Sequence, residues 1–219
     1  MKKAWCKADP ALLEQLQTEV NSVYPNLRFV LRNEIVVIKG SFPVIHEGRV
    51  LDRYNLEIEL SSDYPDSVPT VREVGGRIPR VANRHMRDDG EACLFLPDER
   101  WRVCPPGSSL LNFLKGAVHN FFLGQSLVER GQPWPFGEWG HGGEGVRQYY
   151  AELCGTDDIS VILKYLEYLS RPEIKGHWEC PCGSKKRLRN CHSAKLNELR
   201  KKIPPSVAKE SLRELLKGL

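Results

Sequence analysis

Four potential metal ligands lie close together near the C-terminus, in the stretch ECPCGSKKRLRNCH. Cys180 and Cys182 form a Cys-x-Cys pair, and Cys191 and His192 form a second pair after eight intervening residues. Thiolates and imidazoles in two tight pairs are typical of tetrahedral Zn²⁺ sites, and Gly183 allows the chain to turn back toward the ion. Four protein ligands leave no open coordination position. The sequence therefore predicts a structural zinc ion rather than a catalytic one.

Another cysteine, Cys93, lies in an apolar stretch, GEACLFLPDERW, within a long segment without periodicity between residues 77 and 106. Catalytic groups concentrate on long loops that a rigid scaffold holds in place. A thiol is nucleophilic near neutral pH and forms reactive acyl esters. The alternative is that Cys93 only fills the core, because free cysteine is among the most frequently buried residue types. Residue composition alone favours packing over a nucleophilic role.

The elements that must position these cysteines predict an α+β fold. Asp9 and Pro10 are a helix cap and a first-turn proline, and the apolar residues after them recur with helical spacing. Tyr54 to Leu60 alternate apolar and polar side chains, which predicts a strand with one face in water, as in an antiparallel sheet. Helices are expected at residues 9–25, 108–124, 156–170 and 205–219, and strands at 27–33, 34–42 and 54–60, with one more after Pro69.

Several residues together resemble the ubiquitin-conjugating enzymes over about residues 9 to 154. The pattern consists of Tyr64-Pro65 with Pro69, then Gly90, the Cys93-Leu94 pair and Trp101, followed by a helix that begins at a serine. The resemblance implies a ubiquitin-conjugating (UBC-like) fold with an antiparallel meander sheet and flanking helices. It also implies that Cys93 carries an acyl group as a thioester and transfers it to an amine. This combination outweighs the packing alternative.

The resemblance assigns roles near Cys93, with departures from the family pattern. The family's His-Pro-Asn element places an oxyanion-stabilising asparagine eight residues before the cysteine, where this chain has His85, so His85 is expected to donate to the oxyanion. The alternative is a surface histidine, and Asn83 is a possible substitute. No residue matches the family's proton-accepting carboxylate securely, and the candidates are Asp98, Glu99 and His141.

The cluster near the C-terminus resembles the SEC-C motif, a zinc-binding element of bacterial proteins. Cys180, Cys182, Cys191 and His192 match its ligands, and Gly183 and Ser184 match its turn. The two resemblances together imply a bacterial conjugating enzyme of antiphage (CBASS-type) operons. Its expected partner supplies a C-terminal carboxyl group and is a cGAS-like nucleotidyltransferase or a ubiquitin-like protein, with a separate activating enzyme. The alternative is a catalytically silent UBC-fold adaptor with a zinc docking tail.

Length and charge set the remaining expectations. Residues 171–219 hold 13 lysines and arginines against 5 acidic residues, which gives +8, whereas the rest of the chain carries −4. The basic run around the zinc ligands has no interleaved aromatic residue beyond Trp178, so a solvated face is favoured over contacts with phosphates or with an acidic protein surface, and nucleic acid is not the favoured partner. A zinc-dependent nucleic-acid-binding protein is a third hypothesis. No apolar run is long enough to cross a bilayer, and a cytoplasmic location is expected. The predicted parts are a catalytic domain at 1–155, a connecting helix at 156–172, and the zinc motif with a basic helical tail at 173–219.

Overall fold

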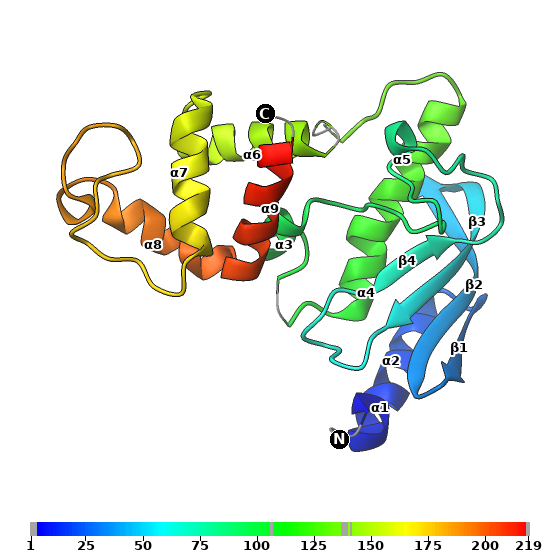
Figure 1. Ribbon diagram of the computed structural model, residues 1–219. Helices are drawn as coiled ribbons and strands as arrows, with labels where there is room; N and C mark the ends of the chain where they lie inside the picture. The colour runs from blue at the N-terminus through cyan, green and yellow to red at the C-terminus, as the bar shows by residue number, and fades with distance from the viewer. Residues whose placement is uncertain (1–3, 106, 137–139, 141, 218–219) are drawn as a thin grey trace. The chain divides into compact units, whose positions relative to one another are not determined.

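The computed structural model describes residues 4–105, 107–136, 140 and 142–217, and the chain divides into two compact units (Figure 1). Unit 1 comprises Met1–Phe95 and Arg102–Gly137, and unit 2 comprises Leu96–Trp101 and Glu138–Leu219. The division after Gly137 lies earlier in the chain than the predicted domain boundary at residue 155. A six-residue segment that directly follows the Cys93 stretch also belongs to unit 2, so neither unit is one continuous piece of chain.

Unit 1 contains a four-stranded antiparallel sheet in the order β1-β2-β3-β4, and the fold is α+β, as the sequence predicts. The strands are β1 (Leu27–Arg32), β2 (Ile35–His46), β3 (Arg49–Leu60) and β4 (Thr70–Glu73). Each strand pairs with the next along the chain, through Phe29 with Ile38, Ile38 with Ile58, and Ile58 with Val71. The three polar loops between strands therefore produce an antiparallel meander.

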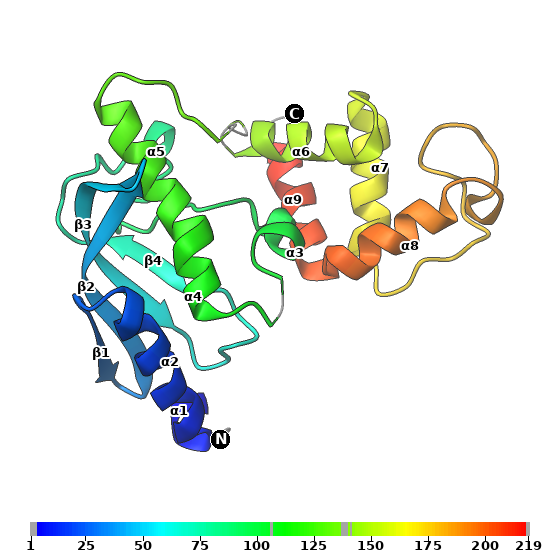
Figure 2. The ribbon, with the colours of Figure 1, turned by 180° about the vertical axis from the view of Figure 1, so that it is seen from behind.

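One face of the sheet is covered by helices and forms the core of unit 1. The alternation in β3 is confirmed, because Tyr54, Leu56, Ile58 and Leu60 are all buried. Helix α2 (Pro10–Val23) packs beside β1, and α5 (His119–Glu129) packs on β2 and β3 (Figure 2). Asp9 caps α2 through a 3.0 Å bond from the Leu12 N–H, as its position predicts.

The long helix over the sheet has three parts. It begins as α4 (Leu110–Phe113), passes through a π-helical turn at Leu114–Val118, and continues as α5. The Ser109 hydroxyl accepts a 3.1 Å bond from the Asn112 N–H, which confirms the expected serine cap. The predicted helix is therefore present, with one π-helical turn within it. Short elements complete unit 1: α1 (Trp5–Ala8) and the 3₁₀ turn η1 (Ala82–Arg84), while α3 (Arg100–Val103) spans the boundary.

Unit 2 is helical and has its own core. It contains the 3₁₀ turns η2 (Pro97–Glu99) and η4 (Leu188–Asn190), and the helices α6 (Gly143–Cys154), α7 (Ile159–Ser170), α8 (Ser193–Lys202) and α9 (Pro205–Lys217). Helix α9 packs on α6 and α7 through Ala208, Ser211 and Leu215. The helices α7 and α9 match the predictions. The apolar residues of α6 and α8 are sparse, so the sequence pattern did not predict these two helices. No helix in the described parts of the chain is long and apolar enough to span a bilayer.

Candidate functional site

Cys93 is exposed at the end of a tight turn that extends the sheet of unit 1. Residues 90–92 run antiparallel along β4, with bonds of 2.9 Å from the Glu73 N–H to the Gly90 carbonyl oxygen and 2.8 Å from the Ala92 N–H to the Val71 carbonyl oxygen. Ala92 is buried, and the thiol of the next residue therefore faces the opposite way, into solvent. The core-filling interpretation of this cysteine does not fit the exposed side chain.

Gly90 makes this arrangement possible through its backbone. Its φ is +84°, in the left-handed region that glycine adopts without a steric penalty. A Cβ added here would lie 2.9 Å from the carbonyl oxygen of Glu73 in the neighbouring strand. Glycine at this position is therefore required by the close approach of two backbones, and Cys93 follows three residues later.

His85 is joined to Cys93 through the backbone. The Cys93 N–H donates to the His85 carbonyl oxygen at 2.8 Å, and His85 itself has a left-handed φ of +49°. Its half-buried ring packs against Trp134, with 5.6 Å between ring centroids. His85 is thus an ordered neighbour of Cys93 in the backbone network rather than a freely solvated loop residue. Asn83 lies on the same turn and is exposed.

Gln125 anchors this turn to the long helix. The sequence pattern did not predict this role. Gln125 is completely buried, donates to the Arg84 carbonyl oxygen at 2.7 Å, and accepts from Arg84 Nε at 2.8 Å. A buried amide that satisfies both a carbonyl group and a guanidinium fixes its partner in space. The available sequence signal was a glutamine within the apolar run FFLGQSLV, where a leucine would satisfy the helical pattern.

Arg87 is a cation that interacts with the Cys93 side chain. Coulombic interaction with Glu91 is the largest effect that raises the pKa of Arg87, and a side-chain hydrogen bond with Cys93 is the next. The residue lies on the turn between η1 and Gly90, where its N–H donates to the Glu91 carbonyl oxygen at 2.9 Å. Arg87 therefore belongs to the immediate surroundings of Cys93.

Two of the three candidate proton acceptors, Asp98 and Glu99, belong to unit 2, whereas Cys93 belongs to unit 1. Asp98 and Glu99 are buried within the core of unit 2, with 3% and 4% of their surface exposed, instead of being solvated loop residues. Asp98 accepts bonds of 2.5 Å from the Tyr150 hydroxyl and 2.8 Å from the Ser211 hydroxyl. Burial raises the pKa of Asp98, and these two donors oppose that rise. These contacts give Asp98 a structural role in unit 2. The third candidate, His141, lies outside the described residues.

Trp101, which is part of the pattern that resembles the ubiquitin-conjugating enzymes, belongs to unit 2. Its indole N–H donates to the Tyr149 hydroxyl at 3.0 Å, and the Lys202 ammonium lies 4.3 Å from the ring centroid. Trp101 and Asp98 together attach the segment after Cys93 to the helices of unit 2.

The predicted metal ligands converge in unit 2. The ligand atoms of Cys180, Cys182, Cys191 and His192 all lie within 4.8 Å of one another. His192 Nδ1 is 3.2 Å from the sulfurs of Cys180 and Cys191, and the Cys182 and Cys191 sulfurs are 3.6 Å apart. Tetrahedral bonds of about 2.3 Å to sulfur and about 2.0 Å to nitrogen place such atoms about 3.5–3.8 Å apart. The cluster could bind a metal ion.

Backbone hydrogen bonds order the loop that carries this cluster. The Cys180 N–H donates to the Lys186 carbonyl oxygen and the Leu188 N–H to the Trp178 carbonyl oxygen, both at 2.8 Å. Burial raises the pKa of the Cys180 thiol, whereas a hydrogen bond from Ser184 lowers that of Cys182. These bonds close a compact loop that brings the two ligand pairs together.

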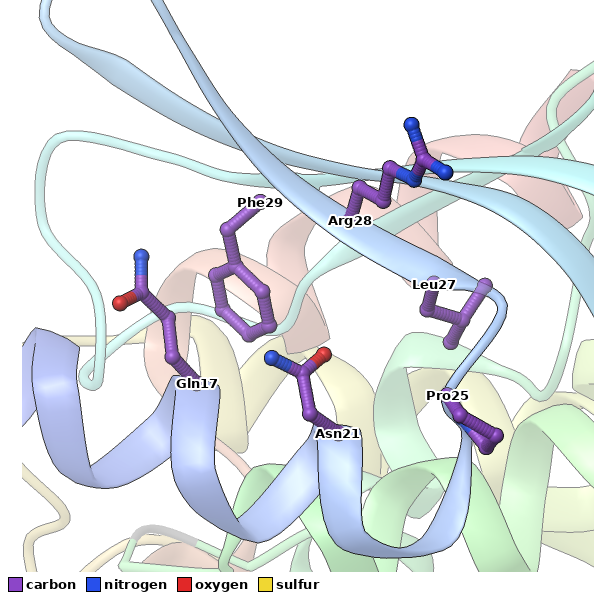
Figure 3. Close-up of a pocket in the computed structure, with 6 residues that line it drawn as sticks. All are labelled: Gln17, Asn21, Pro25, Leu27, Arg28 and Phe29. Atoms are coloured by element: carbon purple, nitrogen blue, oxygen red, sulfur yellow. The ribbon is translucent and has the colours of Figure 1, made fainter.

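A separate pocket lies at the outer edge of the sheet, between α2 and β1 (Figure 3). Its volume is about 490 Å³, and the residues that line it are Gln17, Asn21, Pro25, Leu27, Arg28 and Phe29. The predicted site residues do not contribute to it. It therefore adds nothing to the chemistry expected of Cys93.

No protein-family model, curated protein or solved structure matches the chain.

Proposed function

We propose that this chain is a conjugating enzyme that carries an acyl group on Cys93. The single observation that supports this most strongly is the exposed thiol at the end of a turn fixed to β4, in a unit with a four-stranded antiparallel sheet. A structural cysteine has no need of exposure, whereas an acyl carrier must meet two macromolecules in succession. The substrate is the C-terminal carboxyl group of a partner protein.

The reaction has two steps. The Cys93 thiolate attacks an activated carboxyl carbon, a carbon–sulfur bond forms, and the activating group leaves. A neutral amine then attacks the thioester, and its nitrogen loses a proton to water. The tetrahedral oxyanion collapses, an amide bond forms as the carbon–sulfur bond breaks, and the thiolate of Cys93 is released. The activating step requires a separate enzyme, because a carboxylate does not react with a thiol by itself.

His85 and Arg87 fit supporting roles in this chemistry. The backbone hydrogen bond from Cys93 to His85 holds these two residues next to each other. The imidazole of His85 is half-buried, and an imidazole N–H can donate to an oxyanion. Arg87 supplies a positive charge beside the sulfur. We place Asn83 as the second possible donor, because it lies on the same turn.

The biological setting that fits is bacterial antiphage defence of the CBASS type. There the donor is a cGAS-like nucleotidyltransferase or a ubiquitin-like protein, and the acceptor is an amine. This setting rests on the two resemblances and not on the geometry.

We also propose that the cluster of unit 2 holds a structural zinc ion. Three sulfur ligands and one imidazole are the donor set that zinc favours, and four protein ligands leave no position for a substrate. Cobalt substitution tests this assignment, because tetrahedral Co²⁺ with three thiolates has intense visible absorption. Loss of that absorption in Cys182→Ser, but not in Cys154→Ser, is the expected result. An absorption that survives Cys182→Ser contradicts the ligand set.

One observation favours a second candidate, a UBC-fold adaptor without catalysis. Asp98 and Glu99, the candidate proton acceptors, are both sequestered in unit 2. An adaptor needs an interaction surface but no group to deprotonate an amine. The two candidates differ in whether Cys93 ever forms a covalent adduct.

Trapping that adduct is the decisive experiment. The protein is co-expressed with the products of its neighbouring genes, and mass spectrometry follows the mass on Cys93. We expect an adduct that hydroxylamine and thiols release, that becomes a thiol-resistant oxyester in Cys93→Ser, and that is lost in Cys93→Ala. The buried Cys104→Ala is the matched control and retains the adduct. Absence of any adduct in a folded wild-type protein favours the adaptor.

A further inference from the structure

Four basic side chains project from the loop between the two ligand pairs of the metal cluster. They are Lys185, Lys186, Arg187 and Arg189, and we call them the knuckle face. All four are exposed, whereas Leu188 between them is completely buried. The loop thus turns its one large apolar side chain inward and its charges outward.

The knuckle face combines a dense run of cations with a lack of ion pairs. Seven other cations of unit 2 pair with a nearby acid, and they are Arg147, Lys164, Arg171, Lys175, Lys202, Arg213 and Lys217. Lys195 and Arg200 donate to backbone carbonyl groups instead, and Lys201 and Lys209 have no ion pair among the described residues. The four cations of the knuckle face also form no ion pair with any residue that the structure describes, and residues 180–197 include no acid. Four of the five residues from 185 to 189 are cations, so the knuckle face is the densest run of positive charge in the sequence of unit 2.

The loop presents these charges on a fixed backbone. The Arg189 N–H donates to the Gly176 carbonyl oxygen at 2.9 Å, and Arg187 pairs with Glu179 in an isolated β-bridge. A bound Zn²⁺ with three thiolates and one neutral imidazole adds one negative charge, which the four cations outnumber. Little conformational entropy is lost when a preordered cationic loop meets an anion.

The absence of an apolar anchor decides which kind of anion fits. Protein interfaces depend on buried aromatic and aliphatic anchors. Among the described residues of unit 2, the one exposed large apolar side chain is Leu216, on α9 and not on the loop. Trp178, the nearby aromatic residue, packs on Tyr168 with 4.8 Å between centroids. The loop offers an acidic protein surface positive charge but no apolar anchor residue. It also offers the bases of a single strand no free aromatic ring on which to stack.

We propose that the knuckle face binds the phosphate backbone of duplex nucleic acid, without reading its sequence. Lysine and arginine contacts to phosphates release counterions and need no apolar complement. This reverses the expectation from the sequence, where a basic run without aromatic residues pointed away from nucleic acid. The exposure of all four cations on an ordered loop without an acidic partner, which the sequence does not give, accounts for the reversal.

Fluorescence anisotropy of the full-length protein with a labelled DNA duplex of about 20 base pairs, and with the RNA duplex of the same sequence, tests the proposal. Four phosphate contacts predict a salt slope of about −3.6, so that affinity falls about 100-fold between about 50 and 200 mM salt. Replacement of Lys185, Lys186, Arg187 and Arg189 by alanine should weaken binding at least about 10-fold at the lower salt concentration and flatten the slope.

The matched control removes the same number of lysines and arginines elsewhere in unit 2. It replaces Arg147, Lys164, Arg213 and Lys217, each of which is paired with an acid, and it should bind within about threefold of the wild type. Equal loss in the control variant overturns the proposal, because net charge alone would then explain binding. Three further outcomes also overturn it: no duplex binding at the lower salt concentration, tighter binding to polyglutamate than to either duplex, or tighter binding to single strands.

Discussion

The Ser211 hydroxyl lies 2.8 Å from both carboxylate oxygens of Asp98, although the two residues are 113 positions apart in the chain. Ser211 is on α9, and Asp98 is on η2, in the segment that follows Cys93. Both are buried, so this contact is a structural tie within unit 2.

Ser211→Ala should destabilise the protein by about 1–3 kcal/mol, because it removes a donor from a buried carboxylate. Urea unfolding followed by circular dichroism measures the change. Ser206→Ala on the exposed side of the same helix is the control and should change the free energy of unfolding by less than about 0.5 kcal/mol. Equal effects of the two variants would show that the tie contributes nothing.

Asp98 should make stability depend on pH. Its pKa is raised by burial, so the folded state favours the protonated acid, and this contribution is complete below the ordinary aspartate pKa of about 3.9. It is lost as the pH rises through the raised value. Relative to Asp98→Asn, the wild type should therefore become progressively less stable from about pH 4 upward. A difference that is constant with pH would contradict the raised pKa.

Gln125→Leu should loosen the turn that carries His85. The substitution keeps the volume but leaves the Arg84 carbonyl group without its donor, at a cost of about 1–3 kcal/mol. Hydrogen exchange should accelerate in residues 82–93 more than in β2 and β3. Asn120→Leu, at an exposed position of the same helix, serves as the comparison and should leave exchange in this turn unchanged.

Cys93 should react with a maleimide before Cys6, Cys104 and Cys154 in the native protein. Burial slows Cys6 and Cys104, and burial also raises the pKa of Cys154 to about 11, which leaves little thiolate near neutral pH. We expect Cys93 to react at least about 10-fold faster than these three. Peptide mapping at short times identifies the labelled site, and earlier labelling of Cys104 or Cys154 would show that the thiol of Cys93 is not accessible.

His85→Ala should slow aminolysis of the thioester by about 100-fold and its formation much less, if the imidazole stabilises the oxyanion. His85→Asn should restore transfer, because an amide also donates and asparagine tolerates the left-handed backbone at this position. His46→Ala, elsewhere in unit 1, controls for loss of a histidine. Equal loss of both steps in His85→Ala, or no rescue by asparagine, argues against this role.

Local patterns predicted the parts of the fold that depend on one periodicity. The alternation from Tyr54 to Leu60 and the caps at Asp9 and Ser109 led to elements that the structure contains, and ligand spacing alone identified the metal cluster. Long-range partners were beyond such patterns. Asp98 looked like a loop acid because Ser211 and Tyr150 are distant in sequence.

The candidate site shows the same limit. The position of Cys93 in an irregular segment suggested its role, but Gln125 and Arg87 were missed. The role of the buried Gln125 is evident only from its hydrogen bond to the Arg84 carbonyl group. Arg87 is one of several charged residues in the run HMRDDGE, and only the folded turn shows that it interacts with Cys93.

The insertion of Leu96–Trp101 into unit 2 has a consequence for the order of events on the ribosome. The stretch immediately downstream of the thiol is translated early, but its hydroxyl donor at Ser211 emerges only with the last helix. An incomplete nascent chain therefore cannot finish the surroundings of Asp98, however well the sheet has already assembled. The segment Leu96–Trp101 can therefore form its hydrogen bond to Ser211 only after α9 has been synthesised.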